Sequence, residues 1–289
     1  MRFSIYGLLI ALLVIAGCES EFDPFQPADD INFSIYGFLD AAADTQFVAV
    51  TPLRDSIATR AAPIDAAVTL EELGTGRRTV WQDSLFTFSD GSVGHVFWSP
   101  EEITPGQAYE FTVQRSDGAS STVRVAIPDV VPTLELSTNF DPFSPILPRL
   151  QNIGVAGAEK MADFQVVYTL LLEGGEVVRE FGISYLDQAR QNEATGRFGL
   201  AFDSYSDVQA RFPNNCPTAL EAEVFVAAAG EEWPDFFRLD LETLARPDFA
   251  LNVEQGLGFL GGVVTQRVEW PGLVSLFGLK QGQCLRGKR

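Results

Sequence analysis

Residues 109–127 read YEFTVQRSDGASSTVRVAI and carry the clearest structural signal in the chain. Tyr109, Phe111 and Val113 alternate with polar residues in the first part, and apolar residues alternate in the same way after position 122. A period of two is typical of a half-buried β-strand. Asp117-Gly118 lies between the two runs and supplies the positive φ angles of a tight hairpin. The stretch therefore predicts an antiparallel pair of strands.

The same period recurs on both sides of this hairpin, from residue 31 to residue 128. Here we also expect strands at 31–39, 46–53, 68–70, 85–88 and 93–98. Short strands separated by turn residues over a segment of this length indicate an immunoglobulin-like β-sandwich.

The C-terminal part, residues 151–289, is also expected to be rich in strands, at 164–172, 176–181, 197–202, 219–227 and 263–270. One helix is expected at 235–245, where Pro234 suits the first turn and Arg246-Pro247 ends the pattern. Prolines punctuate residues 129–150, which we interpret as a Pro-rich linker. The predicted fold is mainly β: an N-terminal immunoglobulin-like β-sandwich, residues 31–128, followed by a second β-rich domain with one short helix.

The N-terminus has the features of a lipoprotein signal. The apolar stretch 5–17 spans only about 20 Å as a helix, short of the roughly 30 Å of a bilayer core, so it fits a signal peptide better than a membrane span. Ile15-Ala16-Gly17-Cys18 matches a lipobox. We expect a signal peptide at 1–17, lipidation of Cys18 and an acidic tether at 18–30. An uncleaved signal with a buried Cys18 is the alternative.

The composition excludes several classes of protein. The 289 residues include 39 acidic and 20 basic side chains, which gives a formal net charge of −19. Phosphates would be repelled by such a protein, and this excludes a nucleic-acid binder. His95 is the single histidine, so a metal site with several histidine ligands is excluded. We expect no metal and no cofactor.

The two cysteines outside the lipobox are Cys216 and Cys284. In an oxidising compartment a pair of cysteines usually forms a disulfide. Such a bond would tie the C-terminal tail to the second half of the chain. Two unpaired thiols are the alternative.

Motifs that resemble catalytic or cofactor sites have simpler explanations here. Residues 256–261 have G-x-G-x-x-G spacing, but a strand-like run follows them instead of a helix, so we interpret the glycines as a bend, a bulge or a close backbone approach. His95 lies in a strand-like run with no nucleophile motif beside it, which favours a packed histidine. Three acidic pairs could in principle serve as the acid and base of a glycoside hydrolase: Glu71-Glu72, Glu101-Glu102 and Glu231-Glu232. The two residues of each pair are adjacent in sequence, so they are better explained as solvated residues.

Aromatic side chains are the remaining candidates for ligand binding. Tryptophans stack on sugar rings or peptides when they are exposed, and pack in cores when they are not. The four candidates are Trp81, Trp98, Trp233 and Trp270.

The chain resembles a family of outer-membrane lipoproteins catalogued as domain of unknown function 4249. The resemblance rests on the lipobox and on segments 35–39, 48–50, 66–70, 105–109, 236–238 and 252–259. The chain departs from the family pattern at Phe236 and Phe237, where tyrosines are expected, and at Gln255, where glycine is. Members are typically encoded beside TonB-dependent outer-membrane transporters, which implies an accessory role, and the family brings no catalytic residues.

These observations together predict a non-enzymatic protein, lipid-anchored at the periplasmic or cell-surface face of the outer membrane, that acts as partner of a TonB-dependent transporter. A surface lipoprotein that binds carbohydrate or peptide through exposed tryptophans is the second hypothesis. An acid-pair hydrolase is the third.

Overall fold

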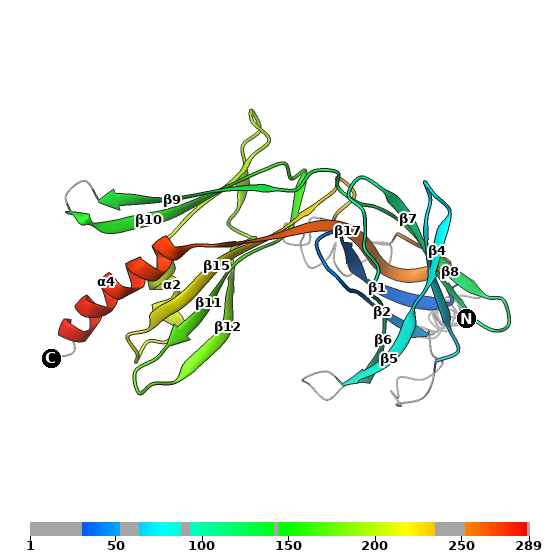
Figure 1. Ribbon diagram of the computed structural model, residues 1–289, viewed down its shortest axis with the longest axis horizontal. Helices are drawn as coiled ribbons and strands as arrows, with labels where there is room; N and C mark the ends of the chain where they lie inside the picture. Colours follow the sequence, from blue (N-terminus) through cyan, green and yellow to red (C-terminus); the bar gives the residue numbers. More distant parts are fainter. Residues whose placement is uncertain (1–30, 53–63, 88–92, 142–143, 235–251, 288–289) are drawn as a thin grey trace, which may run out of the picture.

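The computed structural model describes residues 31–52, 64–87, 93–141, 144–234 and 252–287 (Figure 1). The predicted signal peptide, the predicted lipidation site Cys18, the predicted acidic tether and the helix expected at 235–245 lie outside these residues. No helix among the described residues is both long enough and apolar enough to cross a membrane.

One eight-stranded sheet runs through both lobes of the molecule (Figure 1). Its order is β12-β11-β15-β17-β1-β2-β6-β5. The strands are β1 (Phe33–Asp40), β2 (Gln46–Pro52), β5 (Gln82–Thr87), β6 (Val93–Ser99), β11 (Lys160–Leu171), β12 (Val177–Ser184), β15 (Thr218–Ala229) and β17 (Gly256–Glu269).

In the N-terminal lobe a five-stranded sheet, β16-β8-β7-β3-β4, packs on one part of the long sheet. Its strands are β3 (Ala67–Glu72), β4 (Arg77–Val80), β7 (Ala108–Gln114), β8 (Ser120–Ala126) and β16 (Val253–Glu254). The inward residues of both sheets form one core, in which Trp81 packs edge-on against Phe111 with 5.2 Å between ring centroids. The predicted β-sandwich is confirmed, and so is the hairpin of β7 and β8.

In the C-terminal lobe a four-stranded sheet, β13-β14-β10-β9, faces the other part of the long sheet. Its strands are β9 (Thr133–Asp141), β10 (Ser144–Ala156), β13 (Arg190–Gln191) and β14 (Phe198–Phe202). In the part of this lobe that the structure describes there are two helices: α2 (Ser204–Arg211) and α4 (Pro271–Gly287). The sequence analysis missed both helices.

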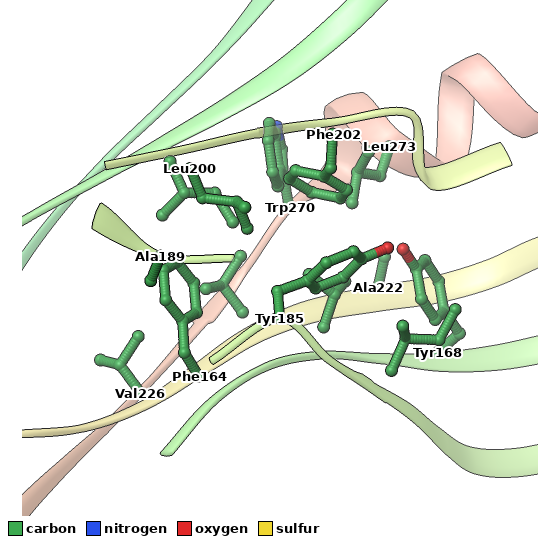
Figure 2. Packing of buried hydrophobic residues seen from close by; sticks show 14 of the residues in the cluster. Phe164, Tyr168, Tyr185, Ala189, Leu200, Phe202, Ala222, Val226, Trp270 and Leu273 are labelled. Carbon is green, nitrogen blue, oxygen red and sulfur yellow. The ribbon is translucent and has the colours of Figure 1, made fainter. Parts of the chain in front are cut away.

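Aromatic rings dominate the core of this lobe, which is shown in Figure 2. Tyr168 and Tyr185 are fully buried and their hydroxyls point toward each other. The Tyr185 hydroxyl donates to the Asp207 carboxylate on α2 at 2.8 Å. Burial, the largest cause in both cases, raises the pKa of the two tyrosines.

β17 belongs to both lobes. Its first part, from Gly256 to Val263, pairs parallel with β1, and its second part, from Val263 to Glu269, pairs antiparallel with β15. The expected boundaries are therefore corrected at two places. Residues 253–263 complete the N-terminal sandwich through β16 and β17, although the sequence placed them in the second domain. Residues 129–150 are no linker, because β9 and most of β10 lie there.

The glycines at 256–261 lie inside β17 and allow a close approach of backbones. Gly258 has a φ of 107°, and a Cβ there would collide with the carbonyl oxygen of Ile35 on β1. Further along β17, a Cβ on Gly262 would collide with the carbonyl oxygen of Ala126 at the end of β8. The interpretation as a close backbone approach is confirmed.

Candidate functional site

Two exposed aromatic side chains come from β1. Along this strand Ile35 and Leu39 are buried, whereas Tyr36 and Phe38 are 57% and 49% exposed. Side chains of a strand alternate between its two faces, so Tyr36 and Phe38 lie on the face turned away from the five-stranded sheet. β1 is therefore apolar on both faces, which is unusual for a strand with one solvent face.

The aromatic row continues across the neighbouring strands. Phe38 lies opposite Phe47 of β2, and Phe47 lies opposite Trp98 of β6. Residues opposite each other in adjacent strands share a face, so these rings are neighbours. Phe47 is 58% exposed, and the half-buried Trp98 donates its indole N–H to the Ser84 hydroxyl at 3.1 Å. We call the surface of Tyr36, Phe38, Phe47 and Trp98 the aromatic face.

β17 extends this apolar surface toward the C-terminal lobe. Tyr36 is in register with Phe259, whose ring meets Trp233 edge-on with 5.3 Å between centroids. Further along β17, Val263 packs against alanines of β15. Phe259, Val263 and these alanines are buried, so the exposed part of the apolar surface ends at β1.

The aromatic face carries almost no charge. Among the described outward positions of β1, β2, β5 and β6, Asp40 is the only charged residue. Its carboxylate is buried and accepts hydrogen bonds from the backbone N–H and the hydroxyl of Thr265. Charged residues make up a fifth of this chain. Their absence from the exposed positions of this face therefore distinguishes it from the rest of the surface. Exposed apolar patches of this kind mark interaction surfaces.

His95 lies on the opposite, inward side of β6. It is buried, and its Nδ1 lies 2.8 and 2.9 Å from the two carboxylate oxygens of Asp83 on the edge strand β5. The expectation of a packed histidine agrees with this position.

The acidic pairs do not form pairs of free carboxylates, because their residues point to different sides of a strand, bind arginine or are exposed. Glu71 binds Arg78 at 2.6 Å, while Glu72 faces the other way. Arg77 lies between Glu72 and the buried Glu101, at 3.3 and 3.4 Å. Each carboxylate is thus neutralised by arginine, which suits a structural role better than proton transfer. The remaining glutamates, Glu102, Glu231 and Glu232, are exposed.

The four tryptophans do not gather at one site. Trp81 is buried in the N-terminal core and Trp270 in the C-terminal core. Trp98 and Trp233 are half-buried and lie on the outward face of the long sheet, at opposite sides of β1 and β2. Of the sequence candidates, Trp98 and Trp233 lie at this face, and Tyr36, Phe38 and Phe47 were not among the candidates. The signal was present, since residues 33–39 have apolar side chains at both odd and even positions.

Cys216 is fully buried just before β15 and is disulfide-bonded. Cys284 lies in α4, a helix that packs against β15, but its side chain is outside the described residues. Among the described residues, no three or more His, Cys, Asp or Glu side chains gather as metal ligands.

No protein-family model and no curated protein matches the chain. Among solved structures it is similar to a pullulanase from Anoxybacillus sp. LM18-11, in crystals with and without maltotriose, and to the complex of Dpr2 Ig1–Ig2 with DIP-Theta Ig1–Ig3. Identities are 13% and 11%, each TM-score is 0.22 and 67% of this chain is covered. The chain spans 24% of the pullulanase and 89% of the matched immunoglobulin-domain chain. We draw no functional argument from likenesses this distant.

Proposed function

We propose that this protein is a non-catalytic accessory protein, lipid-anchored at the outer membrane, whose aromatic face docks on a membrane-protein partner. The family resemblance points to a TonB-dependent transporter as that partner. The observation that carries the proposal is the uncharged aromatic face itself. Large rings on a rigid sheet bury much apolar area at little cost in side-chain entropy, and they dominate the energy of protein interfaces.

The position of the aromatic face supports this role. Tyr36 and Phe38 lie in β1, the first strand that the structure describes, a few residues after the predicted tether. A fully extended chain from Cys18 to Phe33 reaches at most about 50 Å. Lipid on Cys18 would therefore hold the aromatic face close to the membrane surface, where an outer-membrane barrel lies within reach.

The chemistry of the aromatic face favours a protein partner over a sugar. Sugar sites combine stacking rings with polar groups that read hydroxyls. Phe38 and Phe47 offer no polar atom, and the indole N–H of Trp98 is already bonded to Ser84. Trp81 and Trp270, which the carbohydrate hypothesis also invoked, are buried.

We also propose that Cys284 is the disulfide partner of Cys216. α4 packs against β15, and Cys216 lies two residues before this strand. The bond would fix the C-terminal helix on the lobe that it covers.

Photo-crosslinking in the full-length, membrane-attached protein tests the docking proposal. A photoreactive amino acid replaces Phe47 on the aromatic face or, as a control, the exposed Arg211 at the end of α2. We expect a crosslink to one outer-membrane barrel from position 47 and none from position 211. Crosslinks of equal strength from both positions, or none to a membrane protein, would overturn the proposal.

A substitution then measures how much the aromatic face contributes. Phe47→Ser should reduce co-purification of the barrel at least about tenfold, because a central ring is lost. The matched control is Leu220→Ser, an exposed apolar residue of β15 in the other lobe, which should leave co-purification unchanged.

A further inference from the structure

A groove of about 700 Å³ lies on the four-stranded sheet of the C-terminal lobe, away from the aromatic face. Glu135, Gly154, Gly199 and Arg190 form one row across β9, β10, β14 and β13. The neighbouring row, which includes Ile153, points to the other side of the sheet and into the core. The groove is therefore on the outward face, and its volume is in the range of small-molecule sites.

The floor of the groove is made of glycines that the fold does not require. A Cβ on Gly199 would meet no atom within 4 Å, and one on Gly154 would meet only Glu135 and Arg197, at 3.7–3.8 Å. Neither glycine has a positive φ. Glycine inside a strand lowers stability, since it gives up backbone entropy and packs nothing. Two such residues side by side are best explained by the space that they leave for a ligand.

The charge of the groove is opposite to that of the protein. Arg197 is bonded to Glu135 at 2.5 Å, so these two charges cancel. The guanidinium of Arg190 is exposed and held in place by the backbone oxygens of Asp187 and Ala189, at 2.6 and 2.9 Å. No carboxylate among the described residues pairs with Arg190. A positive site in a chain of net charge −19 selects an anion.

Apart from Arg190, the polar groups that the groove offers to a ligand belong to side chains and not to the backbone. The backbone groups of β10 are engaged in ladders with β9 and β14. Peptides are commonly recognised through main-chain pairing at a sheet edge, and this sheet face does not offer it. Ser137, Asn152 and Gln188 line the groove. The side-chain nitrogen of Asn152 is buried and has no hydrogen-bond partner among the described residues. Hydroxyls and amides of this kind suit a ligand rich in hydroxyl groups.

We propose that this groove binds an acidic saccharide. Arg190 pairs with a sugar carboxylate, the glycine floor receives the ring, and the side chains of Ser137 and Gln188 bond its hydroxyls. The site is separate from the aromatic face, so the proposal does not depend on docking to a transporter.

Titration calorimetry with the purified protein tests this proposal. The probe is a trimer of galacturonic acid, compared with a neutral galactose trimer and with triglutamate. We expect binding of the acidic sugar and at least about tenfold weaker binding of both others. Equal binding of the neutral trimer would rule out the role of Arg190. If triglutamate binds as tightly as the acidic trimer, the site recognises a carboxylate and not a sugar, and the proposal is overturned. If none of the three probes binds, the proposal is overturned as well.

Three variants locate the binding. Arg190→Gln should weaken binding of the acidic trimer at least about tenfold, whereas Arg124→Gln, an exposed arginine of β8, should not change it. Glu135→Gln should strengthen binding, because it frees Arg197 for the ligand. Gly199→Val should abolish binding while the protein stays as stable as the parent, since the added side chain meets open space. Full binding by Gly199→Val would place the ligand elsewhere.

Discussion

The outward faces of the two lobes have opposite chemistry although both belong to half-buried sheets. The aromatic face of the N-terminal lobe presents four large rings and no exposed charge. The groove of the C-terminal lobe presents glycine, amides and arginine. Ordinary solvent faces carry mixed polar residues. The aromatic face lacks them, whereas the groove combines two glycines with Glu135, Ser137, Asn152, Gln188 and Arg190. The contrast indicates two surfaces with two different partners, one apolar and broad, the other polar and small.

Disrupting β17 gives the largest expected effect, because both lobes share this strand. Gly258→Val forces a branched side chain into a positive φ and against the Ile35 carbonyl, which should cost more than about 3 kcal/mol of unfolding free energy. Urea unfolding of variants that retain only Trp81 or only Trp270 reports each lobe separately. We expect both transitions to move to lower urea. Loss confined to the Trp81 signal would show that the lobes fold independently.

The disulfide should matter to one lobe only. Cys284→Ser should lower the stability of the C-terminal lobe by about 2–4 kcal/mol, the usual effect of opening a loop of this length. The Trp270 transition should shift and the Trp81 transition should stay. Reducing agent should shift the parent protein in the same way. A Cys284→Ser protein that reductant destabilises further would mean that Cys284 is not the partner of Cys216.

Removing rings from the aromatic face should change surface chemistry far more than stability. Phe38→Ser combined with Phe47→Ser should alter the unfolding free energy by about 0.5 kcal/mol or less, since both rings are half exposed. The variant should bind much less of an apolar fluorescent dye than the parent. Arg190→Gln in the groove serves as the comparison and should leave dye binding as it is. Equal dye binding by all three proteins would remove the distinction between the two surfaces.

The smallest effect is expected at high pH. The unfolded pKa of tyrosine is about 10, and burial raises the folded pKa of Tyr168 and Tyr185 above it. The stability from these neutral hydroxyls is complete below about pH 10 and is lost as pH rises above it. Tyr168→Phe should match the parent at pH 7 and lose less stability at alkaline pH. An identical pH profile for both proteins would contradict this.

The sequence predicted β3, β7 and β8 of the N-terminal sandwich because their buried positions alternate with more exposed ones. It failed where that rule does not hold. Pro148 is one of the prolines that favour a linker, but it lies at a register irregularity between β9 and β10, where a strand tolerates proline. α4 contains several glycines, which hid its helical pattern. The row of Glu135, Gly154, Gly199 and Arg190 depends on pairing between strands far apart in sequence, and only the structure reveals it.

The parallel pairing of β1 with β17 has a mechanical consequence. β1 is the first described strand and is bonded on both sides, to β17 and to β2. A pull on the chain at residue 31, along the strand, loads both ladders in shear. The hydrogen bonds then share the tension and must break together, whereas a peeled hairpin opens one bond at a time. Force applied along β1 is therefore opposed by two ladders at once.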